Sequence, residues 1–171
     1  MSQTSSGTTG SGWPRRDEWP GLLAAVIGVN AIGASPVLVA GPDSPWFRAL
    51  EKPALYPPEW AFGVVWTLLF TLLGVALYMI YRRGVGNRSV QVALGAFAVQ
   101  MVLNVVWTPA FFGLESLEIG LLVIVVLWFA IVGAMWAASR VDRRAAALFV
   151  PYLAWVSFAT VLNYQLWQLN A

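Results

Sequence analysis

The sequence predicts an all-α integral membrane protein, built as a bundle of five transmembrane helices. Two observations on composition and patterning support this fold class. Of the 171 residues, 59% are hydrophobic and only 11% are charged, whereas a soluble domain carries about 25% charged residues. Five apolar runs of about 21–23 residues follow one another along the chain. Each is long enough to cross a bilayer as a helix, and lipid offers no partner to the open backbone groups of isolated strands.

The chain divides into a polar tail and one membrane domain. Residues 1–18 are rich in Ser, Thr and Gly and lack the apolar core of a secretory signal peptide, so we expect a disordered tail. Residues 19–171 form the membrane domain. Its predicted spans cover residues 20–40, 60–81, 90–111, 117–138 and 145–167.

The connection at residues 41–59 differs from the others. It is longer, contains five prolines and includes the amphipathic stretch 45–51, which can form a short interfacial helix. The remaining connections are short, so neighbouring spans are antiparallel. Tryptophans lie near several span ends, where indoles favour the membrane interface: Trp19, Trp60, Trp136 and Trp167.

The placement of arginine predicts how the chain is oriented in the membrane. Eight of the ten basic residues lie in the tail, in the second connection (82–89) and in the fourth connection (139–144). An odd number of spans places these three segments on the same side. By the positive-inside rule that side is cytoplasmic. We therefore expect the N-terminus inside, the C-terminus outside and the loop 41–59 facing outward.

The composition also excludes several classes of chemistry. The sequence contains no His and no Cys, which excludes imidazole triads, thiolate nucleophiles and disulfides. No span carries Asp, Glu, Lys or Arg in its body, although Glu118 lies at the start of the fourth. This argues against a pump that uses a carboxylate relay. We expect no catalytic residue, no metal site, no obligatory cofactor and no nucleic-acid partner.

Amide and aromatic residues recur at helical spacing within the spans. Each set lies along one face of a helix: Phe62, Trp66 and Phe70; Gln100, Asn104 and Trp107; Tyr152, Trp155, Ala159 and Asn163; with Asn30 near the centre of the first span. An unpaired amide in hydrocarbon costs several kcal/mol, so these faces point into the bundle. Two interpretations stay open. The amides tie helices together, or they provide the polar edges of a pocket for a large, flat, apolar molecule.

Three long motifs resemble those of a known family. They are KPALYPPEWAFGVVWT at residues 52–67, QMVLNVVWTPAFFG at 100–113 and PYLAWVSFATVLNYQLW at 151–167. They are similar, in the same order, to the loop with the second helix, the third helix and the fifth helix of the TspO/MBR family, which comprises tryptophan-rich sensory proteins and translocator proteins. The resemblance implies a five-helix bundle of the TspO/MBR type that forms a homodimer, here in the cytoplasmic membrane of a prokaryote. Small residues at Ala24–Gly28 and Ala130–Ala134 match a pattern of helix dimerisation.

The resemblance also implies a function and a site. Family members bind porphyrins, haem-related tetrapyrroles and flat drug molecules. It therefore implies that this chain binds porphyrin or haem as a ligand, in an aromatic pocket under the loop 41–59, with a role in tetrapyrrole sensing, transport or regulation. The pocket residues carried over by position are Trp46, Phe47, Pro57, Phe62, Trp66, Phe70, Asn104, Trp107, Ala110, Trp155 and Ala159. No Lys or Arg follows Tyr164, so the family's cholesterol motif is incomplete.

Two alternative functions stay open at this point. The first is an enzyme that degrades protoporphyrin under light, with Trp66 and Trp155 as electron partners of the excited ring, since these two residues resemble the pair implicated in porphyrin photochemistry. The second is a regulatory membrane scaffold that acts through a partner protein. A scaffold would tolerate substitutions in the pocket but not on an exposed helix face.

Overall fold

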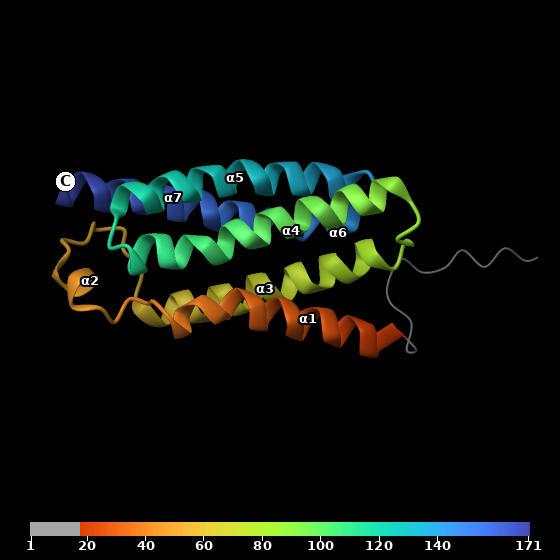
Figure 1. Ribbon diagram of the computed structural model, residues 1–171, viewed down its shortest axis with the longest axis horizontal. Helices are drawn as coiled ribbons and strands as arrows, with labels where there is room; N and C mark the ends of the chain where they lie inside the picture. Colours follow the sequence, from red (N-terminus) through yellow and green to blue (C-terminus); the bar gives the residue numbers. More distant parts are fainter. Residues whose placement is uncertain (1–17) are drawn as a thin grey trace, which may run out of the picture.

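The computed structural model describes residues 18–171, and these residues form five long antiparallel helices joined by short helical turns and loops (Figure 1). The long helices are α1 (Trp19–Ala34), α3 (Glu59–Tyr81), α4 (Arg88–Thr108), α5 (Leu117–Ser139) and α7 (Val150–Asn170). The shorter elements are η2 (Ser35–Leu38), α2 (Pro45–Ala49), the π-helical turn η3 (Pro109–Gly113) and α6 (Arg143–Ala147). The described residues contain no strand, and the predicted all-α five-helix class is confirmed. The predicted disordered tail lies outside the described residues, apart from residue 18.

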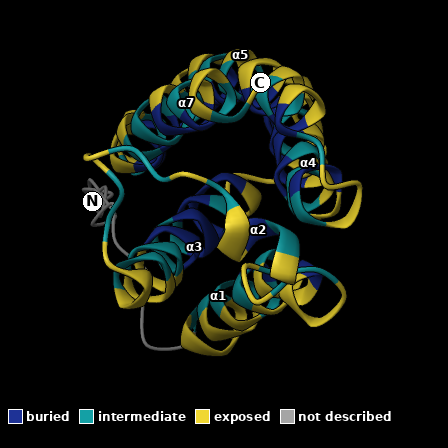
Figure 2. Cartoon of the chain, turned by 90° about the vertical axis from the view of Figure 1, so that its left-hand side faces the viewer, coloured by how far each residue is buried: buried dark blue, intermediate teal, exposed yellow. Residues whose placement is uncertain are grey.

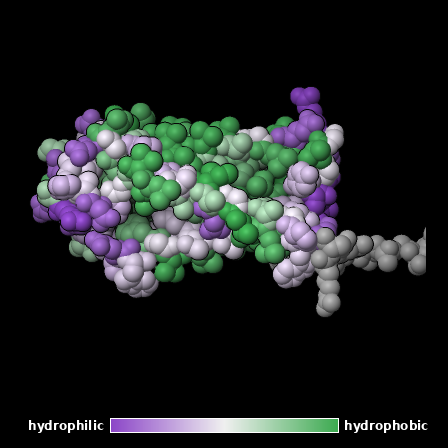
Figure 3. Space-filling view, turned by 60° about the horizontal axis from the view of Figure 1, so that its bottom comes forward, coloured by the Kyte–Doolittle hydropathy of each residue, from purple (hydrophilic) through white to green (hydrophobic). Residues whose placement is uncertain are grey.

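Each long helix carries a segment long and apolar enough to cross a membrane. With the adjoining turns, these segments run over Trp19–Leu38, Glu59–Tyr81, Arg88–Gly113, Leu117–Ser139 and Arg143–Asn170. Large apolar side chains such as Ile27 and Leu122 are each 65% exposed. Figure 3 shows hydrophobic surface along the middle of the molecule and hydrophilic groups gathered towards its two ends. A surface of this kind is stable in contact with lipid rather than water. The chain is an integral membrane protein.

The interior of the bundle is formed by the inward faces of the helices. Helix α1 packs along α3, α4 packs along α5, and α5 packs along α7. In the end-on view of Figure 2 the buried residues face the inside and the exposed residues face outward. The backbones of α1 and α3 approach each other closely at Gly74, where a Cβ atom would lie 2.5 Å from the Cα atom of Val26. Glycine is needed there because no side chain fits between the two helices.

The two small-residue pairs differ in how open they are. Ala134 is only 1% exposed inside the chain, so the pair Ala130–Ala134 does not present an open dimerisation face, in contrast to the sequence-based expectation. It is buried because α5 packs against α4 on one side and α7 on another. On α1, a Cβ atom at Gly28 would meet nothing within 4 Å. The pair Ala24–Gly28 is therefore the more open of the two.

The end of the bundle with the two arginine-rich turns is held by an ion pair. Arg83 donates a hydrogen bond to Asp142 at 2.5 Å, and the backbone N–H of Arg144 donates to the same carboxylate at 2.9 Å as Asp142 caps α6. Burial favours the protonated acid, but the hydrogen bonds and the charge of Arg83 outweigh burial and lower the pKa of Asp142. This carboxylate therefore joins the α3–α4 turn to the α5–α6 turn.

At the opposite end, the loop between η2 and α3 is anchored to the bundle. The predicted short helix in this loop is α2, whose first turn is capped by Ser44 accepting a hydrogen bond from the backbone N–H of Phe47 at 3.1 Å. The side chain of Asn170 accepts from the backbone N–H of Glu51 at 2.8 Å and donates to its carbonyl oxygen at 3.0 Å. These bonds hold the loop against the end of α7.

Candidate functional site

A cavity of about 380 Å³ lies inside the bundle, towards the end that carries the loop with α2. Its volume falls within the roughly 300–1,000 Å³ range of small-molecule sites. All five long helices contribute to the lining, together with η2, η3 and the loop. The lining residues include Asn30 and Gly33 of α1, Tyr56 of the loop, Glu59, Phe62, Trp66, Thr67 and Phe70 of α3, Asn104 and Trp107 of α4, Phe112 of η3, Leu127 of α5, and Trp155 and Ala159 of α7.

Aromatic rings form the walls of this cavity. Helical spacing places Phe62, Trp66 and Phe70 one turn apart on the inner face of α3. The rings of Trp66 and Phe70 are stacked, with centroids 5.2 Å apart. Phe62 meets Trp155 of α7 edge to face, with centroids 5.9 Å apart. These contacts fix ring faces and edges around the cavity, an arrangement suited to a flat, apolar ligand.

A few polar atoms interrupt the aromatic lining. The amide nitrogen of Asn104 donates a hydrogen bond to the hydroxyl of Tyr152 at 3.0 Å, which fixes the orientation of the amide. The indole N–H of Trp107 is engaged with the carbonyl oxygen of Gly120 at 3.1 Å. By contrast, the buried indole nitrogen of Trp155 has no hydrogen-bond partner among residues 18–171. A buried donor without a partner is costly, so this N–H is an unsatisfied polar group beside the cavity.

The cavity brings together seven of the eleven residues predicted for the site. These are Phe62, Trp66, Phe70, Asn104, Trp107, Trp155 and Ala159, which come from three helices far apart in the sequence. Their helical spacing was the signal in the sequence, and the fold turns all three stripes towards one space. The expectation that the stripes face the interior also holds for Gln100 and Asn163, which are 0% and 2% exposed. These two amides lie outside the cavity lining.

The other four predicted residues, which include Pro57, are not among the lining residues. Trp46 and Phe47 of α2 pack against η3 instead: the ring of Trp46 lies 5.8 Å from that of Phe111, and the ring of Phe47 lies 5.0 Å from that of Phe112. Ala110 is buried within η3 itself. Phe112 also lines the cavity, so the aromatic cluster around Phe47 adjoins the cavity wall.

Several lining residues were not assigned to the site from the sequence. Asn30 lines the cavity and donates a hydrogen bond to the hydroxyl of Thr71 at 3.3 Å, across the α1–α3 interface. Gly33 makes room for the ring of Phe70, since a Cβ atom there would lie 2.4 Å from that ring. Glu59 and Thr67 also belong to the lining. Glu59 precedes Phe62 by three residues, so extending the α3 stripe by one turn would have identified it.

Charge is concentrated at the loop end of the cavity. Glu59 is the first residue of α3. Burial raises the pKa of the Tyr56 hydroxyl, and the negative charge of Glu59 raises it further. The amine of Lys52 is also near, but it donates to the carbonyl oxygen of Phe47 at 3.0 Å and lies 4.6 Å from the centre of that ring. Lys52 is therefore held against Phe47, and its amine also lies 5.8 Å from the centre of the Tyr56 ring, although Lys52 itself is not a lining residue.

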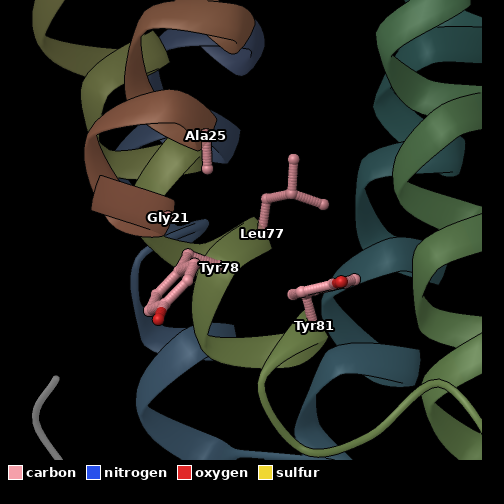
Figure 4. A pocket seen from close by; sticks show the side chains of 5 residues that line it. All are labelled: Gly21, Ala25, Leu77, Tyr78 and Tyr81. Carbon is pink, nitrogen blue, oxygen red and sulfur yellow. The ribbon is translucent and has the colours of Figure 1, made fainter. Parts of the chain in front are cut away.

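A second, smaller recess lies between α1 and α3, towards the other end of both helices. It has a volume of about 260 Å³. Its lining is almost entirely apolar and consists of Gly21, Ala25, Leu77, Tyr78 and Tyr81 (Figure 4). None of the predicted site residues lies there, and it offers neither the stacked aromatic pair nor the amides of the larger cavity.

The fold and the cavity define a class of protein: a five-helix integral membrane protein with an aromatic-lined cavity inside its bundle. The model of the TspO/MBR family matches residues 22–168, and the chain belongs to this family. It is 43% identical over 150 residues to the tryptophan-rich protein TspO of Chlorobaculum tepidum. The aligned residues cover 86% of this chain and 95% of the relative.

Two further relatives span bacteria and animals. The tryptophan-rich sensory protein of Cereibacter sphaeroides is 35% identical over 154 residues, covering 90% of this chain and 93% of the relative. The translocator protein of Homo sapiens is 35% identical over 133 residues, covering 77% of this chain and 79% of the relative. The family resemblance predicted from the three motifs is confirmed.

Proposed function

We propose that this membrane protein binds porphyrin-type tetrapyrroles and related flat apolar molecules in the 380 Å³ cavity, and that it acts in tetrapyrrole sensing, transport or regulation. The single observation that carries the proposal is the cavity lining: stacked and edge-on aromatic rings with a few oriented polar groups at one depth. The names of the relatives, sensory protein and translocator protein, support a sensing or transport role.

The lining suits binding by contact rather than by metal ligation. Trp66 and Phe70 offer a stacked apolar surface, and the ring of Trp155 adds a further aromatic wall. Asn104 is held by Tyr152 with its carbonyl oxygen left as an acceptor. Such an acceptor suits the pyrrole N–H groups of a free-base porphyrin. Because the chain has no His or Cys, haem would be bound mainly through the faces of its ring.

Porphyrin titration of the detergent-purified protein in darkness tests this proposal. We expect saturable quenching of tryptophan fluorescence by protoporphyrin. Affinity should fall at least tenfold when Trp66→Leu is combined with Asn104→Ala, since an aromatic contact and a hydrogen bond are each worth about 1 kcal/mol. Trp60→Leu is the matched control, because Trp60 lies on the same helix but is 72% exposed and outside the lining. Equal, non-saturating quenching in all proteins would mean that porphyrin only partitions into the micelle.

Orientation and assembly form a second part of the proposal. Arg82, Arg83 and Arg88 lie at the same end of the bundle as the turn between α5 and α6 and the start of α6, which together add three more arginines (Figure 1). We propose that this end and the N-terminus face the cytoplasm of a prokaryote, and that the protein is a homodimer. The chain has no cysteine, so Asp43→Cys and Arg143→Cys can be labelled separately with a membrane-impermeant maleimide on intact cells. Only Asp43→Cys should react, and mass measurement in detergent checks the dimer.

Light-dependent porphyrin breakdown is the second candidate function. The observation that favours it is that both Trp66 and Trp155 line the same cavity. In this reading the indoles are electron partners of the excited porphyrin, and dissolved dioxygen is the oxidant that the breakdown of the ring consumes. Illumination should then bleach bound protoporphyrin to a new product, and the double variant Trp66→Phe with Trp155→Phe should bind the ligand without bleaching it. Unchanged porphyrin spectra after illumination of the wild type would exclude this function.

A further inference from the structure

The charges that line the cavity are strongly unbalanced. Glu59 is the one charged side chain among the described residues of the lining, and no Lys or Arg belongs to it. The influence of its carboxylate reaches the neighbouring loop, since it contributes to the raised pKa of Tyr56. Glu59 is an exposed residue, so a ligand in the cavity meets a negative group at the rim of its loop end and no positively charged lining residue.

The basic residues of the adjacent loop lie outside the lining. The Lys52 amine donates to the carbonyl oxygen of Phe47 and lies over the Phe47 ring, and it lies 5.8 Å from the centre of the Tyr56 ring at the edge of the cavity. Arg48 forms an exposed ion pair with Asp43 at 3.3 Å. Neither Lys52 nor Arg48 is part of the lining, so no basic side chain of the lining offsets the charge of Glu59.

The aromatic walls and the Glu59 carboxylate both favour a positively charged ligand. The face of an aromatic ring carries partial negative charge, and cations positioned over Trp, Tyr or Phe are attracted to it. Phe62 precedes Trp66 by one turn and follows Glu59 by three residues on α3, so carboxylate and rings lie along one stripe. Tyr56 adds a further ring, 5.6 Å from that of Phe62.

We propose that Glu59 is a specificity-determining residue that makes this cavity select flat aromatic cations over anions with the same ring system. The inference rests on the proposed function only in assuming that the cavity binds flat ligands. The inference adds a preference for positively charged ligands, to which both Glu59 and the aromatic rings contribute. A porphyrin with carboxylate side chains then binds with its acids directed away from Glu59, so the charge of Glu59 weakens rather than supports its binding.

Three probes of one ring system test the proposal: N-methylacridinium, neutral acridine at pH 8, and acridine-9-carboxylate. Each is titrated into the full-length protein in a non-ionic detergent at about 0.1 M salt, where charges still act over roughly 10 Å, and tryptophan quenching reports binding. For the wild type we expect the cation to bind at least tenfold more tightly than the anion. Glu59→Gln should reduce this ratio to about twofold.

Glu118→Gln is the matched control. Glu118 is also an acidic residue in the first turn of a long helix, and it accepts a hydrogen bond from the indole N–H of Trp167 at 3.3 Å outside the cavity lining. Both variants change the net charge equally, so a difference between them reports the position of the charge. The Glu118→Gln protein should keep the wild-type ratio.

The outcomes separate this inference from the proposed function. A wild-type protein without cation preference, or an equal loss of preference in both variants, would overturn the role of Glu59. Cation selectivity that depends on Glu59, together with failure of protoporphyrin to bind saturably, would support this inference and refute porphyrin as the ligand. Saturable binding of none of the acridines would overturn the inference, whatever protoporphyrin does.

Discussion

Replacing Gly74 by alanine should force α1 and α3 apart. The added methyl carbon would lie 2.5 Å from the Cα atom of Val26, 3.0 Å from its backbone nitrogen and 3.1 Å from the carbonyl oxygen of Ala25. Carbon atoms pack at about 3.5–4.0 Å. Because the opposing atoms belong to the backbone, no side-chain rotation relieves the clash, and the helices have to separate by roughly 1 Å.

The expected cost follows from two opposing effects. Overpacking a well-packed contact costs about 1–3 kcal/mol, and a clash with backbone atoms, which no side-chain rotation relieves, belongs to the upper part of that range, about 2–3 kcal/mol. Alanine favours a helix over glycine by about 1 kcal/mol. The net loss of stability is then about 1–2 kcal/mol, and at about 2–4 °C per kcal/mol the unfolding temperature falls by roughly 2–8 °C. The shape of the cavity should also change, because Asn30 and Gly33 of α1 line it opposite α3.

Thermal unfolding in detergent, followed by circular dichroism and tryptophan fluorescence, measures this effect. The matched control is Gly28→Ala on α1, where the new methyl group would meet nothing within 4 Å. That variant should be as stable as the wild type or slightly more stable. A Gly74→Ala protein that unfolds at the wild-type temperature, or a Gly28→Ala protein destabilised to the same extent, would refute the reasoning.

Three other predictions concern buried polar groups. Tyr152→Phe removes the hydroxyl that accepts from Asn104 and should cost about 1 kcal/mol in thermal unfolding; unchanged stability would show that the amide finds another partner. Gln100→Met should raise the unfolding temperature, because both polar atoms of this fully buried amide lack partners among residues 18–171; a lower unfolding temperature would contradict this. Asp142, whose pKa is lowered by Arg83, stabilises the protein above the unfolded pKa of about 4 and loses this contribution as pH falls through the lower folded pKa. Asp142→Asn should therefore flatten the acid side of the stability profile, and an unaltered acid profile would contradict the assignment.

The inward-facing residues of the individual helices could be predicted from the sequence. Phe62, Trp66 and Phe70 could be placed on one face from spacing alone, because a helix returns to the same face every three to four residues. The cost of an unpaired amide in hydrocarbon then directs the polar stripe of α4 inward, and the structure buries Asn104 as expected. Both arguments are local to one helix, which is why they succeed.

The contacts of the loop 41–59 could not be predicted in this way. Trp46 and Phe47 were assigned to the pocket by position, yet α2 turns them onto the aromatic residues of η3. Asn30 was recognised as a buried amide but not as a wall of the cavity. Which residues meet in space depends on how α2 is anchored by Glu51 and Asn170, residues 119 positions apart, and no local pattern encodes such a contact.

The sequence by itself determined that this is a five-span membrane protein of the TspO/MBR family, which faces of its helices turn inward, and which chemistry its composition excludes. These properties follow from run length against bilayer thickness, from helical periodicity and from residue type. Only the tertiary structure decided that α1 completes the cavity with Asn30, that Glu59 is the charged group of its lining, and that α2 packs beside the cavity. Those contacts arise from packing between helices distant in the chain, where position depends on the shape of every neighbouring surface.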